Sequence, residues 1–84
     1  MIVLWRAATE PRRAGFAVSR QIRGAVQRNR ARRRLREAYR ATRDTAPPNT
    51  ALVIIGRPAA LREAFSALTT ELRGALAAIP GPRP

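Results

Sequence analysis

Apolar and polar residues alternate along two short segments near the start of the chain. Residues 2–8 (IVLWRAA) and 14–20 (AGFAVSR) are rich in strand-forming residues, and the intervening TEPRR is typical of a turn. Successive side chains of a strand point to opposite faces. Val3 and Trp5 therefore share a face of the first predicted strand, and Phe16 and Val18 share a face of the second.

A helical period replaces this alternation between residues 25 and 43. Nothing in the segment breaks a helix, and at about 100° per residue its apolar positions fall on one narrow stripe. This stripe consists of Ala31, Leu35, Ala38 and Thr42, and the opposite side carries Asn29, Arg33, Arg36 and Arg40. The segment is predicted to be a helix with a thin apolar seam and a broad cationic face.

The second half of the chain predicts a third strand and another helix. After the loop DTAPPNT, residues 51–57 (ALVIIGR) form a continuous apolar run, which is typical of a central strand covered on both faces. An amphipathic helix is predicted next, from apolar residues spaced four and three apart: Leu61, Phe65, Leu68, Leu72, Ala75 and Ile79. We expect an α/β domain over residues 1–79, built as a two-layer sandwich, and a disordered tail over residues 80–84.

Charge changes this picture. The 84 residues include 17 basic and 5 acidic ones, for a net charge of +12, and every basic residue is arginine. A GC-rich genome would account for the absence of lysine, but not for the position of the arginines, ten of which lie between residues 20 and 43. Arginine forks onto phosphate groups and stacks on flat rings, so the composition favours nucleic acid as a partner.

The residue types exclude several kinds of chemistry. With no cysteine and no histidine, the chain can form no disulfide, no thiolate metal site and no histidine-based catalytic site. Its five acids are scattered, so we predict no catalytic residue and no metal ligand in the protein. The opening MIVLW is too short for a signal peptide or a membrane span. A cytoplasmic protein with no membrane partner and no small-molecule substrate is expected.

Three interpretations of the basic helix compete. A solvated charged surface normally mixes signs, whereas residues 23–40 contain eight arginines and a single acid, Glu37. A membrane-binding or protein-binding helix would need large apolar residues, and this seam is mainly alanine. Arg28 and Arg30 lie in the first turns, where the helix dipole disfavours positive charge, so compensation by an external anion is expected. Recognition of an RNA or DNA backbone is favoured.

The order of motifs GFAVSR, AVQRNRARRRLREAYR and VIIGRP closely resembles the bacterial ribonuclease P protein family. That family's signature is an Arg-Asn-Arg triplet that opens a helix, followed by basic pairs and an Arg-Glu. The resemblance covers residues 1 to about 79, and the triplet within its strand–helix–strand context is highly specific. The matching positions are Arg28, Asn29, Arg30, Arg32, Arg33, Arg36 and Glu37.

The resemblance implies the protein subunit of a ribonucleoprotein endonuclease that removes the 5′ leader from precursor tRNA. The RNA subunit would supply the catalytic site with its Mg²⁺, and the protein alone would bind no cofactor. The partners would be ribonuclease P RNA and precursor tRNA. Eight residues would contact the RNA or its magnesium-bound waters: Arg20, Arg28, Asn29, Arg30, Arg32, Arg33, Arg36 and Arg40.

The resemblance also implies details of the fold. Val3, Trp5 and Ala17 would line a cleft for the leader on one face of a small mixed β-sheet. The basic helix would connect two parallel strands by a rare left-handed crossover, in a fold that the family shares with a ribosomal protein domain. A different basic RNA-binding protein, of the ribosomal or chaperone type, is the alternative function, and a DNA or membrane binder forms a third class.

The chain departs from the family pattern in two places. Family members begin with a further basic helix and a strand that this chain lacks, so one sheet face is expected to lose its cover. We expect a start codon assigned too late rather than a true truncation. The family also has a glycine where Arg23 stands, with the small residue displaced to Gly24, which affects how the chain enters the basic helix.

Overall fold

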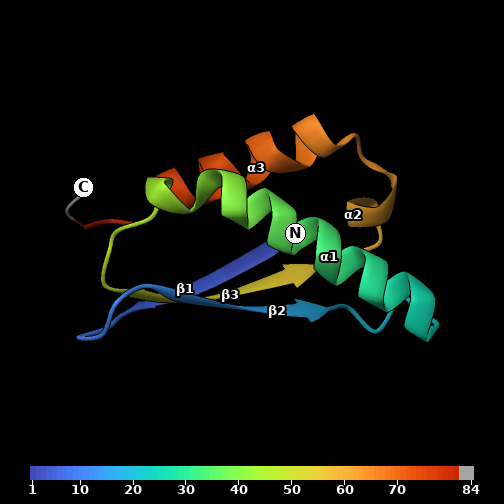
Figure 1. Cartoon of the computed structure of the whole chain (residues 1–84), viewed down its shortest axis with the longest axis horizontal. Coiled ribbons are helices and arrows are strands. Elements are labelled where there is room, and N and C mark those ends of the chain that lie inside the picture. Colours follow the sequence, from blue (N-terminus) through green and yellow to red (C-terminus); the bar gives the residue numbers. More distant parts are fainter. Residues whose placement is uncertain (82–84) are drawn as a thin grey trace.

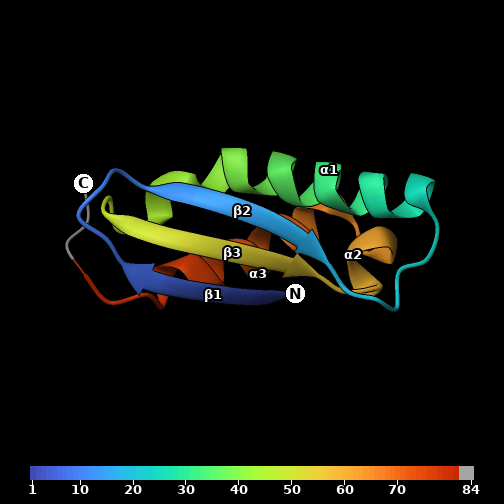
Figure 2. The ribbon, with the colours of Figure 1, turned by 90° about the horizontal axis from the view of Figure 1, so that it is seen from below.

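Three strands form one mixed sheet in the computed structural model, which describes residues 1–81. β1 (Ile2–Ala7), β2 (Arg13–Val18) and β3 (Thr50–Gly56) lie in the order β1-β3-β2 (Figure 2). β3 pairs with β1 in antiparallel fashion and with β2 in parallel fashion. The continuous apolar run of β3 is therefore central, as the sequence predicts.

Within residues 1–81, helices cover only one face of this sheet. α1 (Ala25–Thr42) runs into the 3₁₀ turn η1 (Arg43–Thr45), and α3 (Phe65–Ala77) lies beside α1 on the same side of the sheet (Figure 1). Ile54 of β3 is fully buried beneath the helices, whereas Val53, on the opposite face, is 42% exposed. The prediction that β3 is covered on both faces is therefore wrong.

The connection from β2 through α1 to β3 is left-handed. Figure 2 shows the sheet from the side opposite the helices, with β2 and β3 running in the same direction and α1 behind them. When both strands are turned to point upward, β3 lies to the right of β2 while the connection passes behind the sheet. Parallel crossovers are right-handed in nearly all proteins. The observed hand is the one that the family resemblance implies.

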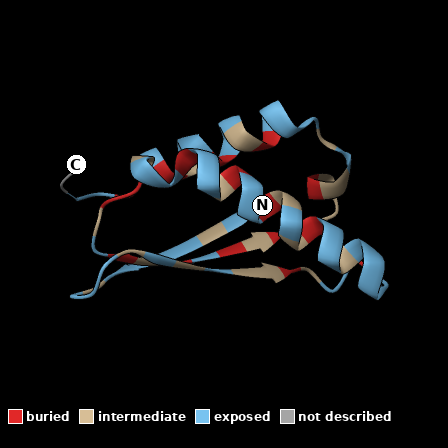
Figure 3. Ribbon diagram, in the orientation of Figure 1, coloured by how far each residue is buried: buried red, intermediate tan, exposed pale blue. Residues whose placement is uncertain are grey.

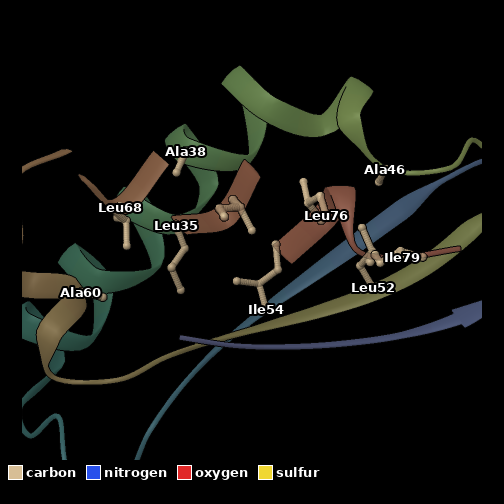
Figure 4. Close-up of a cluster of buried hydrophobic side chains, with 10 residues drawn as sticks. Leu35, Ala38, Ala46, Leu52, Ile54, Ala60, Leu68, Leu76 and Ile79 are labelled. Atoms are coloured by element: carbon tan, nitrogen blue, oxygen red, sulfur yellow. The ribbon is translucent and has the colours of Figure 1, made fainter. Parts of the chain in front are cut away.

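The main core fills the space between the helices and the sheet, where the buried residues gather (Figure 3). Leu68, Leu72 and Leu76, one turn apart on α3, are fully buried and belong to one cluster with Leu35 and Ile54 (Figure 4). Burial of such a leucine contributes roughly 1.5–3 kcal/mol. The four predicted seam residues of α1 are all buried, which confirms that seam: Ala31, Leu35, Ala38 and Thr42.

The C-terminal apolar segment forms two helices instead of the single predicted one. α2 (Ala59–Arg62) ends at Glu63, where the backbone becomes extended, and α3 follows. Arg34 of α1 explains this end, because its Nη1 donates to the carbonyl of Ala60 at 2.7 Å and its Nη2 to that of Glu63 at 2.5 Å. The guanidinium thus supplies donors to carbonyls at the end of α2 that have no partner within the helix.

The break also redirects the residues that precede α3. Leu61 packs against a second cluster formed by Val18, Ile22 and Ala31. Phe65, which the sequence places in the apolar stripe of one long helix, is 44% exposed at the start of α3. The prediction for Phe65 is therefore wrong.

A close approach between α1 and β3 requires a glycine at position 56. A Cβ at Gly56 would lie 2.8 Å from Cδ1 of Leu35, which is fully buried. At the C-terminal end, Ile79 is buried and Pro80 and Gly81 are exposed. The rest of the tail that the sequence predicts to be disordered, residues 82–84, lies outside the described residues.

Candidate nucleic-acid interface

α1 begins at Gly24 without a side-chain cap. Gly24 adopts φ 84° and ψ 141°, a conformation that residues with a Cβ rarely adopt, so the displaced glycine provides the entry into the helix. The first turn contains no acidic residue, and Arg23 and Arg30 nearby are exposed. Free backbone N–H groups and the helix dipole make such an end suitable for an anion.

Arg28, the first residue of the triplet, turns inward. Its Nη1 donates to the carbonyls of Ser19 at 3.1 Å and Ile22 at 3.0 Å, and its Nη2 donates to Val18 at 3.3 Å. These bonds tie the end of β2 and the following turn to α1. Carbonyl dipoles of the chain itself face the charge of Arg28, so the helix dipole alone no longer requires an external anion there, and the contact of Arg28 with RNA stays a prediction.

Most of the other predicted RNA-binding residues are exposed to solvent. Asn29, Arg30, Arg33, Arg36 and Arg40 are exposed on α1, and we call these five residues the α1 arginine surface. Within this surface, Arg40 approaches an acid, Glu37, at 3.8 Å. The structure therefore gathers most of the predicted residues on the solvent side of a single helix, where guanidinium groups are available to an external partner.

Two further predicted residues lie at the border of this surface. Arg32 is half-buried and donates from Nη1 to Oδ1 of Asn29 at 3.3 Å, which holds the amide in place. Arg20 is exposed in the turn after β2, close in sequence to the carbonyls that Arg28 binds. Arg20 precedes α1 in the chain, whereas Arg32 lies two turns into the helix.

Aromatic contacts fix one arginine against the sheet. The guanidinium carbon of Arg36 lies 5.8 Å from the ring centroid of Phe16 in β2. The rings of Phe16 and Tyr39 meet edge to face, with centroids 5.8 Å apart and an interplanar angle of 69°. A cation over an aromatic ring is attracted by about 0.5–1 kcal/mol at an exposed site. The contact holds Arg36 in place between α1 and the β2 edge.

The three residues predicted to line a leader cleft do not share a sheet face. Val3 pairs with Ile54 and Trp5 with Leu52, so both lie on the helix-covered face, and Val3 packs against the main core. Ala17 lies on the opposite, open face. Trp5 is still 45% exposed, because β1 is an edge strand. The prediction of a common face is wrong, since the register between strands decides it.

The open sheet face carries an apolar group of its own. Ile2 and Leu4 of β1 and Val53 of β3 are 42%, 55% and 42% exposed there. Arg6 and Arg13 lie on the same face, and a shallow cavity of about 440 Å³ reaches from these arginines to Leu4 and Val53. The sequence assigned none of these residues to a binding site.

Within residues 1–81, no three acidic side chains lie close enough together to hold a metal ion. In the same part of the chain, no helix has the length and apolar character needed to cross a membrane.

Fold and surface together define a small basic α/β protein whose excess charge is concentrated on the helix that crosses between two parallel strands. The chain belongs to the ribonuclease P protein family, since the family described as Ribonuclease P matches residues 1–79.

Individual relatives agree with this assignment. The chain is 45% identical over 74 residues to the ribonuclease P protein component of Gluconacetobacter diazotrophicus, covering 87% of this chain and 64% of that protein. It is 43% identical over 74 residues to the ribonuclease P protein component of Ruegeria pomeroyi, covering 86% of this chain and 59% of that one. The chain thus spans about three fifths of the length of these relatives.

A solved structure of a ribonuclease P protein has a similar fold. The ribonuclease P protein from Thermotoga maritima superimposes with a TM-score of 0.81 at 28% identity, over 94% of this chain and 76% of that one.

Proposed function

We propose that this chain is the protein subunit of ribonuclease P, which binds the catalytic RNA and assists removal of the 5′ leader from precursor tRNA. Membership in the family supports the assignment to ribonuclease P. The observation that carries the proposal is the α1 arginine surface, whose residues are exposed and, apart from Arg40, form no ion pair within residues 1–81.

The α1 arginine surface would bind the sugar-phosphate backbone of the ribonuclease P RNA. Arginine is suited to this role because its planar fork gives two parallel hydrogen bonds to a phosphate. The start of α1, with Arg30 and uncapped backbone N–H groups, would hold a further phosphate. Arg28 would act in a different way, by shaping the turn from which Arg20 and Arg23 project.

The open sheet face would hold the leader of precursor tRNA. Of the residues predicted for that role, Ala17 lies on this face, whereas Trp5 lies on the opposite face of the edge strand β1 and is 45% exposed. Exposed apolar side chains can support bases, and Arg6 and Arg13 can contact phosphates. Val3, on the opposite face of β1 from Leu4, would contribute indirectly by packing this strand against the main core.

Catalysis would belong to the RNA subunit. The Mg²⁺ ions required for cleavage would be bound by RNA, and the arginines would contact phosphates or metal-bound water around them. The cytoplasm is the proposed location, where ribonuclease P RNA and precursor tRNA would be available to the protein.

Reconstitution tests the proposal. The chain is added to bacterial ribonuclease P RNA, and cleavage of precursor tRNA is followed at a Mg²⁺ concentration too low for the RNA alone. Stimulated cleavage is expected. Binding without stimulation would favour the alternative of a different basic RNA-binding protein, and absence of binding would contradict both.

A matched pair of variants separates the proposed surface from net charge. The double variant Arg30→Gln with Arg33→Gln removes two charges from the α1 arginine surface. The control Arg62→Gln with Arg73→Gln removes two exposed charges from α2 and α3. The first variant should weaken RNA binding by roughly tenfold or more, whereas the control should change it by less than about threefold. Equal losses would mean that only the total charge matters.

A further inference from the structure

A second basic site lies at the end of α1 opposite the Arg-Asn-Arg triplet. A cavity of about 420 Å³ opens between the start of β2, the end of α1 and the loop before β3. Its polar lining consists of Arg12, Arg13, Tyr39, Arg43, Asp44 and Asn49. We call it the Tyr39 pocket. Of its polar residues, only Tyr39 lies within the motifs that carry the family resemblance.

The charge of the Tyr39 pocket is positive and partly fixed in position. Arg12 donates from Nη1 to the carbonyl of Ala46 at 2.7 Å, and its Nη2 lies 3.5 Å from Oδ1 of Asp44. Its side chain is only 18% exposed, so it is held at the wall of the pocket. A guanidinium has five N–H donors, and these contacts leave several for another acceptor.

Arg43 supplies charge that the chain itself does not neutralise. It is exposed at the end of α1, and it forms no ion pair within residues 1–81. Arg13, by contrast, is paired with Glu10. An anion in the pocket would therefore meet Arg12 and Arg43 first.

Tyr39 gives the pocket an aromatic wall and a hydroxyl donor. Its ring is held by the edge-to-face contact with Phe16, and Phe16 in turn lies under Arg36 of the α1 arginine surface. Burial raises the pKa of Tyr39, although Arg12 and Arg43 act in the opposite direction and Asp44 adds to the rise. The hydroxyl therefore stays protonated at neutral pH and can donate to an anion.

We propose that the Tyr39 pocket binds one nucleotide of a single-stranded RNA segment, with its phosphate on Arg12 and Arg43 and its base or ribose against Tyr39. A site with an aromatic ring beside two arginines fits a nucleotide better than a free anion, because the ring contributes stacking and the arginines contribute charge. The inference extends the proposed function, since it adds a second RNA contact to the α1 arginine surface.

The start of α1 and the Tyr39 pocket are so far apart that only an RNA segment of several nucleotides could contact both. α1 has 18 residues, and at about 1.5 Å per residue its ends are roughly 27 Å apart. A free phosphate can occupy one end only. The contacts from Arg36 through Phe16 to Tyr39 run between α1 and the β2 edge and connect the α1 arginine surface to the pocket.

Nuclear magnetic resonance of the ¹⁵N-labelled chain tests this inference, with hexauridylate as the probe and inorganic phosphate as the comparison at equal phosphate concentration. Hexauridylate should shift the amides of residues 12–14, 39–44 and 49 as well as those at the start of α1. Inorganic phosphate should shift the pocket amides much less. Equal shifts from both probes would overturn the nucleotide assignment and leave a simple anion site.

Variants distinguish the pocket from the rest of the interface. Arg43→Gln should remove most of the pocket shifts and weaken hexauridylate binding by roughly three- to tenfold, while shifts at residues 23–33 persist. The control Arg62→Gln removes one exposed charge elsewhere and should leave the pocket shifts intact. Tyr39→Phe keeps the ring and should retain a part of the effect.

The two proposals fail in different ways. If hexauridylate moves only the amides of residues 23–36, the Tyr39 pocket is not a nucleotide site and the proposed function is untouched. If it moves only the pocket amides, the α1 arginine surface loses its role and the pocket inference stands.

Discussion

Replacement of Arg28 by alanine should destabilise the free protein, although this residue opens the triplet that marks an RNA-binding family. The change removes three hydrogen bonds from the guanidinium to the carbonyls of Val18, Ser19 and Ile22. Hydrogen bonds from a charged donor contribute about 1.5–3 kcal/mol each when buried. Because the site is half-buried, we expect about 1 kcal/mol for each bond, and a total of about 2–3 kcal/mol.

The effects that would stabilise the Arg28→Ala variant are smaller than this loss. Alanine is a better helix former and relieves the repulsion between Arg28 and Arg32 at i,i+4, but these gains amount to a few tenths of a kcal/mol. An 84-residue domain has a free energy of unfolding of about 4–12 kcal/mol. The loss is therefore a large share of the total, and with an m-value of about 1 kcal/mol/M the urea midpoint should fall by about 2–3 M.

The assay is urea unfolding followed by circular dichroism at 222 nm, in chloride buffer without phosphate, sulfate or RNA. Arg30→Ala is the matched control, because Arg30 is exposed on the same helix and its loss should change stability by no more than about 0.5 kcal/mol. Arg28→Lys keeps the charge and loses the fork, so its midpoint should lie between those of Arg28→Ala and the wild type. Equal midpoints for Arg28→Ala and Arg30→Ala would refute the assignment of Arg28 as a positioning residue.

Three further outcomes follow from the structure. Gly56→Ala should lower the free energy of unfolding by about 1–3 kcal/mol, because the new methyl group meets Leu35. Gly74→Ala on α3 should raise it by about 0.5–1 kcal/mol, because a Cβ there would meet nothing within 4 Å. Thermal unfolding measures both variants, and shifts of the same sign would contradict this reasoning. The raised pKa of Tyr39 means that the folded state holds the phenolic proton more tightly than the unfolded state, so this contribution to stability is complete below about pH 10 and is lost as pH rises through the folded-state pKa. Urea midpoints between pH 9 and 11 should therefore fall less steeply for Tyr39→Phe than for the wild type. Parallel curves for the two proteins would contradict this sign. The affinity for ribonuclease P RNA should fall by roughly 0.7–0.9 log units per log unit of salt for each phosphate neutralised, so filter binding from 50 to 300 mM salt should give a steep line, and a flat one would exclude an electrostatic interface.

Local patterns in the sequence determine the elements and the charge of this protein. The helix predicted over residues 25–43 is observed as Ala25–Thr42, and its four seam residues are all buried. The central position of β3 also follows from its continuous apolar run. These features depend on periodicity and propensity within some 20 neighbouring residues, so they can be recognised without knowledge of distant segments. The Arg-Asn-Arg triplet of the family lies within the same predicted helix.

Only the tertiary structure decides which arginines are available and which side chains share a face. Arg28 and Arg34 are indistinguishable in sequence from the exposed arginines around them, yet both donate to backbone carbonyls, and Arg34 divides the C-terminal segment into two helices. Val3 and Ala17 lie on opposite faces because the pairing of each strand with β3 sets their relative register. A long side chain bonds to whatever acceptor the fold brings within reach, and the fold brings these acceptors from elements other than the helix that carries the arginines.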